Sequence, residues 1–256
     1  GHPNPTVIDW GHGLINAVGL PNPGVEAEVE IITTARELLA PLGIPLIASI
    51  FADTVAGFAA VAERISAARP DLIEINISCP NVAAEFGRPF ALDAVSAAQV
   101  TTAVRGATEL PIIVKLSPNV TDIVAIARAV QEAGADAIAA INTLGPGMVI
   151  DVESGRPILA NRVGGVSGPA IRPIAVRCVY DICAAVNVPV VGIGGVTCGR
   201  DVVEMVMAGA TAVGVGSAVY QGGPEVFGCI RGELAEWMRA HNCTSLSDFR
   251  GIAHER

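Results

Sequence analysis

Residues 111–142 read PIIVKLSPNVTDIVAIARAVQEAGADAIAAIN, with two apolar runs on either side of a segment with helical spacing. The runs Pro111–Leu116 and Ala137–Asn142 are apolar without alternation, which is typical of parallel strands covered on both faces. Between them, Thr121–Ala133 opens with Thr121 and Asp122 in capping position. The stretch therefore predicts a strand–helix–strand unit with parallel strands.

The same pattern recurs on both sides of this unit. Four further apolar runs predict strands at Pro45–Ile50, Leu72–Ile77, Pro189–Gly194 and Thr211–Gly216. Segments with helical spacing predict helices at Val25–Leu39, Ala52–Ala67, Ala91–Ala107, Pro169–Val186, Arg200–Ala208 and Pro224–His241. Six alternations of strand and helix indicate an α/β protein, either an open doubly wound sheet or a (β/α)8 TIM barrel.

The choice between these two architectures depends on the first predicted strand. No glycine fingerprint follows it, because Phe51–Thr54 stands there instead, and this disfavours a dinucleotide-binding open sheet. A barrel needs eight strands, and the leading helix Val25–Leu39 has no predicted strand before it. The barrel interpretation therefore implies that the first two strands lie upstream of Gly1, whereas the open sheet needs no missing piece.

Composition narrows the class of function. The 256 residues are 51% hydrophobic, 16% charged and 4% aromatic, with a formal net charge of −9. Such a chain folds, and its acidic balance and few aromatics argue against binding nucleic acid or an anionic membrane. No apolar run nears the roughly 18–20 residues that span a bilayer. The six cysteines have no C-x-x-C spacing, so we expect reduced cysteines in a cytoplasmic protein without metal. The length favours one domain, residues 1–256, with two domains as the alternative.

Polar or glycine residues follow nearly every predicted strand, which is where barrels place their active sites. Asn76–Asn81, Lys115 and Asn142-Thr143 follow three of them. Gly194-Gly195 and Gly216-Ser217 follow the last two, where barrels bind phosphate. The alternative is that these glycines form plain turns between strands and helices.

Two reactive side chains lie among these residues. Lys115 would be desolvated at the end of an apolar strand unless an anion or an electron-rich ring pairs with it, the alternative being a surface lysine. Cys79 lies between Ser78 and Pro80 in a loop poorly suited to packing, the alternative being a buried structural cysteine. The glycine-rich stretch Leu144–Gly168 predicts a long irregular binding loop. The four histidines lie away from the strand ends, so a histidine triad or zinc site is not expected.

Six segments in order resemble class 1 dihydroorotate dehydrogenase, a flavin enzyme of pyrimidine (UMP) biosynthesis. They are Gly13–Gly24, Ile75–Asn81, Val114–Asn119, Ile141–Thr143, Pro157–Asn161 and Gly164–Ile171. Asn142-Thr143 and Ser167–Pro169 look more like the NAD-linked branch and its catalytic FMN subunit, while the fumarate-using branch stays open. The resemblance implies a TIM barrel that oxidises dihydroorotate to orotate.

The resemblance also assigns roles to residues. Cys79 would be the base that removes the C5 proton, with hydride passing from C6 to flavin N5, and Lys115 would lie near the N1/O2 edge of the flavin. The implied FMN contacts are Ser49, Asn76, Lys115, Ile141, Gly168, Gly194, Gly195, Gly216 and Ser217. The implied substrate contacts are Asn16, Ala17, Val18, Gly19, Leu20, Asn76, Asn81, Asn142 and Thr143. A separate subunit with FAD and an iron–sulfur cluster, and a homodimer or heterotetramer, are implied as partners.

Two departures from the family pattern stand out. Ser49 occupies a position where many NAD-linked members have Asn, which puts one flavin contact in doubt. The family's first two strands, which carry a flavin loop and a substrate-contacting lysine, have no counterpart here, and Gly1 aligns after them. We therefore expect an N-terminally truncated sequence that binds FMN weakly or not at all, which a flavin-release assay on both lengths would test.

Three rival functions remain at this point. A dihydropyrimidine dehydrogenase domain shares the cysteine loop and the flavin barrel but acts on uracil or thymine, which lack a carboxylate. Asn81 and the loop Asn16–Leu20 favour dihydroorotate. A phosphate-binding barrel without flavin is the second alternative. A non-catalytic flavoprotein subunit, or an inactive fragment of a flavin barrel, is the third.

Overall fold

The computed structural model describes residues 1–78 and 90–255, and its internal contacts divide the chain into two compact units. Unit 1 comprises Gly1–Pro21, Ala140–Ala184 and Val190–Arg256. Unit 2 comprises Asn22–Ala139 and Ala185–Pro189. The expectation that residues 1–256 act as one domain stays a prediction.

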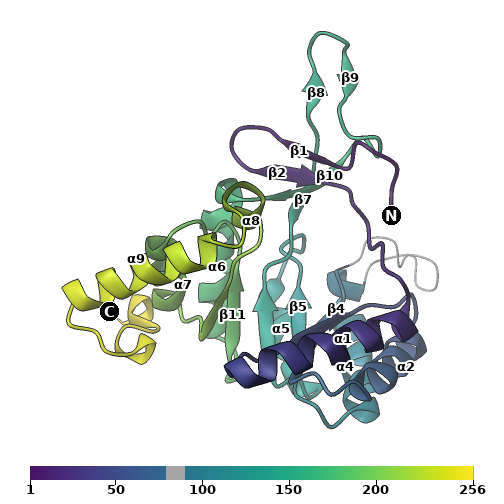
Figure 1. Ribbon diagram of the computed structural model, residues 1–256, viewed down its shortest axis with the longest axis horizontal. Helices are drawn as coiled ribbons and strands as arrows, with labels where there is room; N and C mark the ends of the chain where they lie inside the picture. The colour runs from purple at the N-terminus through teal and green to yellow at the C-terminus, as the bar shows by residue number, and fades with distance from the viewer. Residues whose placement is uncertain (79–89, 256) are drawn as a thin grey trace. The chain divides into compact units, whose positions relative to one another are not determined.

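Unit 2 is a parallel sheet with helices between its strands (Figure 1). Its strands are β3 (Ile47–Ile50), β4 (Leu72–Asn76), β5 (Ile112–Leu116) and β6 (Ala137–Ala140), in the order β6-β5-β4-β3. Its helices are α1 (Val25–Leu39), α2 (Val55–Ser66), α4 (Ala94–Ala107) and α5 (Ile123–Glu132), with short 3-10 turns η1 (Ala40–Leu42) and η2 (Phe90–Leu92). Each of these strands and helices lies within a segment that the sequence predicts.

Apolar side chains fill the space between strands and helices in unit 2. Ile73, Ile75 and Val114 are fully buried, and the rings of Phe58 and Phe90 meet edge to face at 5.8 Å. Successive strand residues point to opposite faces, so Glu74 lies on the face opposite Ile73 and Ile75. One face of this sheet is therefore packed against its helices, and Glu74 lies on the other.

Side-chain caps begin helices α2 and α5 of unit 2, and the cap of α5 lies where the sequence predicts it. Thr54 accepts a hydrogen bond from the backbone of Gly57 at the start of α2, and Asp122 accepts one from Ala125 at the start of α5. Such caps satisfy backbone donors that have no partner within the helix.

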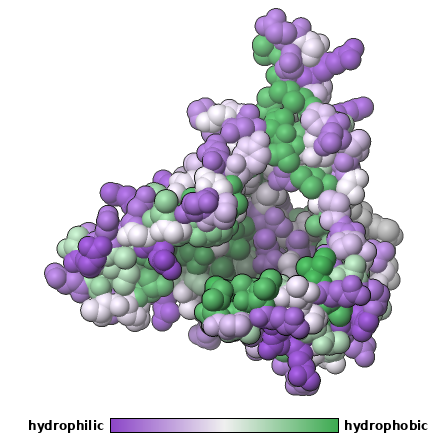
Figure 2. Space-filling view, in the orientation of Figure 1, coloured by the Kyte–Doolittle hydropathy of each residue, from purple (hydrophilic) through white to green (hydrophobic). Residues whose placement is uncertain are grey.

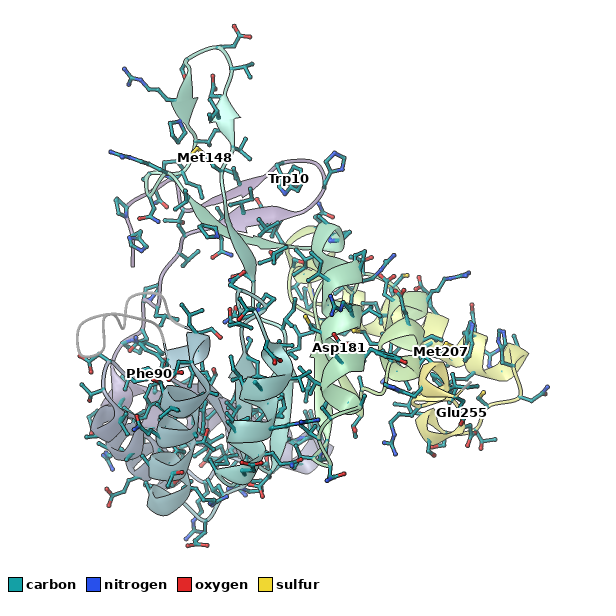
Figure 3. The ribbon with its side chains drawn as sticks, turned by 180° about the vertical axis from the view of Figure 1, so that it is seen from behind. Trp10, Phe90, Met148, Asp181, Met207 and Glu255 are labelled. Atoms are coloured by element: carbon teal, nitrogen blue, oxygen red, sulfur yellow. The ribbon has the colours of Figure 1, made fainter. Side chains whose placement is uncertain are left out.

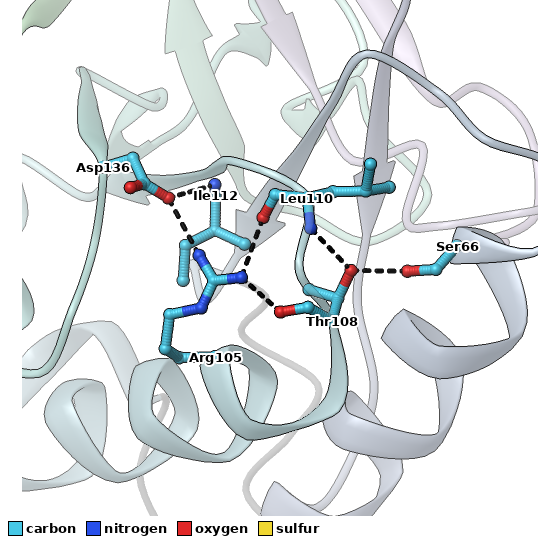
Figure 4. A network of polar contacts seen from close by, with 6 residues as sticks. All are labelled: Ser66, Arg105, Thr108, Leu110, Ile112 and Asp136. Atoms are coloured by element: carbon cyan, nitrogen blue, oxygen red, sulfur yellow. Dashed lines mark hydrogen bonds and ion pairs between the residues drawn. The ribbon is translucent and has the colours of Figure 1, made fainter.

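A polar network closes the amino-terminal end of the same sheet (Figure 4). The Arg105 guanidinium forms an ion pair with Asp136 at 3.0 Å and donates to the carbonyls of Thr108 and Leu110. Asp136 also accepts from the backbone of Ile112, the first residue of β5. Interactions at this end of parallel strands stabilise the fold, which leaves the carboxyl ends for function.

Unit 1 contains an antiparallel sheet that the sequence did not predict. Its order is β1-β2-β10-β7, formed by β1 (Val7–Asp9), β2 (Leu14–Asn16), β10 (Gly164–Ser167) and β7 (Leu144–Gly147). A two-stranded hairpin, β8 (Ile150–Asp151) and β9 (Arg156–Pro157), extends beyond this sheet (Figure 1). Trp10 lies in the turn between β1 and β2 (Figure 3).

Two expectations are therefore wrong. Strands β1 and β2 precede the leading helix, which was expected to have none before it, and Leu144–Gly168 is not irregular, since β7 to β10 lie within it. These strands have two to four residues each, too few to show an alternating pattern. In addition, β2 pairs with β10 about 150 positions away, which local sequence cannot indicate.

The remainder of unit 1 is α/β. Strands β11 (Val190–Ile193) and β12 (Ala212–Gly214) are parallel. The helices are α6 (Arg172–Cys183), α7 (Gly199–Met207), α8 (Ala218–Gly222) and α9 (Val226–Ala240), with 3-10 turns η3 (Pro169–Ile171), η4 (Leu246–Asp248) and η5 (Ile252–His254). Among the α-helices of unit 1 in the described residues, the short α8 falls outside the predicted helices.

The β8–β9 hairpin carries exposed apolar side chains. Met148, Ile150 and Val152 have exposed fractions of 47%, 51% and 86%. Figure 2 shows hydrophobic side chains along the hairpin below a hydrophilic tip.

None of the helices in residues 1–78 and 90–255 is long and apolar enough to cross a membrane.

Candidate active site

The predicted phosphate residues of unit 1 converge on Gly168. A Cβ placed on Gly168 would lie 3.6 Å from Ser217 Oγ, and one on Gly195 would lie 2.8 Å from the Gly168 carbonyl oxygen. A Cβ on Gly194 would lie 3.5 Å from a side-chain carbon of Ile141, which is itself 2% exposed. The segments after β10, β11 and β12 therefore approach one another closely.

The conformation of these turns explains why they contain glycine. Gly168, Gly194 and Gly195 have φ values of +90°, +138° and +72°, which side chains rarely tolerate. At Gly216, by contrast, a Cβ would meet nothing within 4 Å. Three of the four glycines are thus required by the backbone, and the fourth faces open space.

A pocket of about 420 Å³ lies beside these turns within unit 1. It is lined by Gly11, His12, Gly13, Leu14, Gly168, Pro169, Ala170, Thr197, Ser217, Ala218 and Gln221. The turn between β1 and β2 forms one side, and the residues before α6 and α8 form another. Sequence reasoning identified Gly168 and Ser217 here but missed Thr197 and the contribution of His12.

A buried carboxylate supports the turn after β11. Asp201 is 4% exposed and accepts from the backbone N–H groups of Thr197 and Cys198 and from the Thr197 hydroxyl. It also pairs with Arg172, whose Cβ would be 2.7 Å from a Cβ on Gly195. Asp201 therefore fixes residues on both sides of the predicted phosphate turn. The aspartate in the first turn of a helix was the available signal in the sequence.

Two of the predicted substrate residues, Asn16 and Thr143, meet at Gly165, and a third, Asn142, contacts Thr143. The Asn16 side-chain amide donates to the Gly165 carbonyl at 3.5 Å, and a Cβ on Gly165 would lie 2.2 Å from Thr143 Oγ1. Asn142 Oδ1 accepts from the backbone of Thr143 at 2.8 Å. All three polar side chains are half-buried. They form a group of amide and hydroxyl functions suited to a polar heterocycle.

The next residues, Ala17 to Leu20, leave β2 as an extended segment. The Ala17 N–H donates to the Thr6 carbonyl at 2.7 Å, and the Val18 carbonyl accepts from His2 at 3.2 Å. Gly19 has a φ of +79°. These predicted substrate residues are half-buried and follow Asn16 without a break in the chain.

Unit 2 holds the rest of the described site residues, on the face of its sheet opposite Ile73 and Ile75. Lys115 Nζ lies 3.9 Å from Glu74 Oε1, with side-chain exposures of 22% and 16%. The Ser49 hydroxyl donates to the same oxygen at 2.8 Å. Lys115 is thus paired with an anion, one of the two arrangements expected for it. Glu74 was missed because its strand reads as apolar.

Asn76 lies beside Lys115 at the carboxyl end of β4. The two are partners in the parallel pairing of β4 with β5. Asn76 Oδ1 accepts from the backbone of Ser78 at 3.2 Å. Cys79 and Asn81, the predicted base and a predicted substrate contact, lie outside the described residues.

Two titratable groups near these elements have shifted pKa values. The backbone N–H of Gly11, and then the Gln221 side chain, hold the pKa of Asp9 below its ordinary value. Burial raises the pKa of the Cys183 thiol to about 11. Within residues 1–78 and 90–255, no three His, Cys, Asp or Glu side chains are grouped as metal ligands.

Comparison with known proteins identifies the family of this chain. The family model for dihydroorotate dehydrogenase matches residues 1–238. The chain belongs to the dihydroorotate dehydrogenase family. This family is flavin-dependent and has the TIM-barrel fold, so the predicted α/β barrel class and oxidoreductase class are confirmed.

Several curated relatives are similar to this chain over most of its length. Three are each named dihydroorotate dehydrogenase B (NAD(+)), catalytic subunit. The one from Methanothermobacter thermautotrophicus is 46% identical over 255 residues, which are 100% of this chain and 82% of the relative. That from Methanosarcina mazei is 44% identical over 255 residues, 100% of this chain and 79% of the relative. That from Anoxybacillus flavithermus is 48% identical over 222 residues, 85% of this chain and 69% of the relative.

Proposed function

We propose that this family member is the catalytic subunit of an NAD-linked dihydroorotate dehydrogenase that oxidises dihydroorotate to orotate with FMN as its flavin. The observation that carries the proposal is the cluster of turns around Gly168, together with the family match. The alternative substrates, uracil and thymine, have no support from the relatives, which are named for dihydroorotate.

The residues of unit 1 fit the phosphate of FMN. Glycine turns expose backbone N–H groups and let an anion approach the chain. The open space beside Gly216 and the pocket lined by Gly168 and Ser217 leave room for such a group. We assign the phosphate to Gly168, Gly194, Gly195, Gly216 and Ser217, with Ile141 packed beneath Gly194.

Lys115, Ser49 and Asn76 are assigned to the flavin ring. The Lys115 ammonium would lie at the N1/O2 edge and stabilise negative charge there. When bound, FMN supplies the acceptor for the hydride that leaves C6 of dihydroorotate. Ser49 takes part through Glu74, to which its hydroxyl donates.

Cys79 is assigned as the base that accepts the C5 proton of dihydroorotate. Oxidation removes one proton and one hydride from dihydroorotate. The Cys79 thiolate would accept the proton from C5, and the flavin would accept the hydride from C6. Asn16, Asn142 and Thr143 would hold the pyrimidine ring and its carboxylate, together with Ala17 to Leu20, Asn76 and Asn81. Their grouping around Gly165 supports this assignment.

The electron acceptor is the second part of the proposal. The relatives are named catalytic subunits with NAD(+), which supports a separate electron-transfer subunit with FAD and an iron–sulfur cluster. We propose a cytoplasmic heterotetramer or homodimer. NAD reduction should need the second subunit, whereas fumarate-dependent turnover by this subunit alone would favour the other branch.

The substitution Cys79→Ala tests the base. In the FMN-loaded complete gene product, we expect flavin reduction by dihydroorotate to slow by about 10²–10⁴-fold, the usual contribution of a general base. Orotate binding should persist, since the thiol is not needed to hold the ring. An unchanged rate would remove Cys79 from the mechanism. If the protein oxidised dihydrouracil but not dihydroorotate, the proposed substrate would be wrong.

A further inference from the structure

The face of unit 2 that carries Lys115 also carries an acid that the proposed reaction does not use. Ile73 and Ile75 are fully buried on one face of β4, so Glu74 lies on the other. The strand register places Glu74 directly opposite Ser49 of β3. Lys115 of β5 pairs two residues further along β4. Hydroxyl, carboxylate and ammonium therefore occupy three adjacent strands.

The distances show how the three groups interact. Glu74 Oε1 accepts a hydrogen bond from the Ser49 hydroxyl at 2.8 Å, which fixes the carboxylate. The same oxygen is 3.9 Å from Lys115 Nζ, beyond hydrogen-bond distance. The attraction is therefore coulombic, and it is strengthened because both side chains are largely shielded from water. The ammonium keeps its N–H donors for another acceptor.

Lys115 is also singular in the sequence. It is the only lysine among the 256 residues, and the other 15 of the 16 basic side chains are arginines. Lysine carries a compact charge on a flexible four-carbon stem, so its position depends on what holds its end. Glu74, anchored by Ser49, is the group that does so here.

We infer that Glu74 is the counter-ion that positions Lys115 and limits how strongly its charge acts on the flavin. The inference rests on the proposed function, since it takes Lys115 to lie at the flavin edge. A carboxylate and an ammonium 3.9 Å apart act as a dipole, whereas a lone ammonium acts as a full positive charge. Glu74 would thus keep the flavin midpoint potential lower than Lys115 alone would set it.

The first test is the flavin midpoint potential of Glu74→Gln in the FMN-loaded complete gene product. We expect the potential to become more positive, because the positive charge of Lys115 is no longer balanced. The matched control is Glu26→Gln, which removes the same charge from an exposed pair with Arg64 on α1 and α2. It should leave the potential unchanged. An unchanged potential in Glu74→Gln would overturn the inference.

The second test follows the lysine itself and needs no flavin. Lysine labelled with ¹³C at Cε gives a resonance that is assigned to Lys115 by its loss in Lys115→Arg. In the wild type we expect restricted motion and two non-equivalent Cε protons. In Glu74→Gln the Lys115 side chain should move more freely, so its two Cε protons should give one averaged signal. Ser49→Ala keeps the Glu74 charge, so the two signals should move only part of the way toward each other. Equal restriction in all variants would refute the positioning role.

The two tests separate this inference from the proposed function. A wild-type protein that takes up no FMN would contradict the proposed function, and the lysine resonance would still decide whether Glu74 holds Lys115. A wild-type protein that takes up FMN, with both readouts insensitive to Glu74→Gln, would contradict the inference alone. Circular dichroism of each variant checks that the fold is kept.

Discussion

Gly168 has a backbone conformation that other residues adopt only with strain. Its φ is +90°, and a Cβ there would approach the Gly13 Cα to 2.9 Å. We expect Gly168→Ala to lower the free energy of unfolding by about 1–3 kcal/mol and to weaken FMN binding. Urea unfolding and flavin titration measure the two effects.

Gly232→Ala is the matched control for this substitution. Gly232 lies within α9, its φ is not positive, and a Cβ there would meet nothing within 4 Å. Alanine should raise the free energy of unfolding there by up to about 1 kcal/mol, because glycine is a poor helix former. Equal effects of the two substitutions would show that the Gly168 backbone is not constrained.

Cys183 provides a prediction about pH. Burial raises the pKa of its thiol to about 11, so at pH 8 only about one molecule in a thousand carries the reactive thiolate. Iodoacetamide should therefore modify the exposed Cys229 first, with Cys183 slower by about 100-fold or more. The rate of alkylation at Cys183 should rise as the pH increases from 8 toward 11, because the thiolate fraction rises. Mass spectrometry after timed quenching measures the alkylation of each cysteine. Similar rates for Cys183 and Cys229 at pH 8 would contradict the raised pKa of Cys183.

At the scale of elements, Asp201 joins α6, α7 and the turn after β11. It is 4% exposed and binds Arg172 and the backbone of Thr197 and Cys198. Asp201→Asn removes its charge and one acceptor oxygen, so we expect a loss of about 2–4 kcal/mol in the free energy of unfolding. FMN affinity should fall as well, because Gly195 lies against Arg172.

The exposed pair of Arg177 and Asp181 is the control for that prediction. Asp181, labelled in Figure 3, lies one turn from Arg177 on α6, and the two side chains are 32% and 80% exposed. Asp181→Asn should change the free energy of unfolding by less than about 0.5 kcal/mol. If both substitutions cost the same, the burial of Asp201 would not matter.

How far sequence predicts these elements depends on where their partners lie. Helix α1 has the predicted bounds, and β5 begins one residue after Pro111, because proline cannot donate to a ladder. The short strands β1, β2 and β7 to β10 were missed because each has two to four residues, and β2 pairs with β10 across the chain. Glu74 was missed as a site residue because its role comes from Ser49 and Lys115 on neighbouring strands.

At the scale of the whole molecule, the residues that we assign to FMN and substrate are divided between the two compact units. The phosphate turns and the group around Gly165 belong to unit 1, whereas Ser49, Asn76 and Lys115 belong to unit 2. The order of the motifs along the sequence predicts that these residues serve one function. What sequence could not provide is the support around them, such as Asp201 and Glu74, because that support depends on packing.

The most direct test of the account is an anaerobic visible spectrum of the complete gene product with FMN, before and after addition of dihydroorotate. We predict that the yellow protein bleaches, because the substrate reduces the bound flavin without any electron acceptor present. Dihydrouracil at the same concentration should leave the spectrum unchanged. A protein that takes up no FMN, or one that stays yellow with dihydroorotate, would contradict the account.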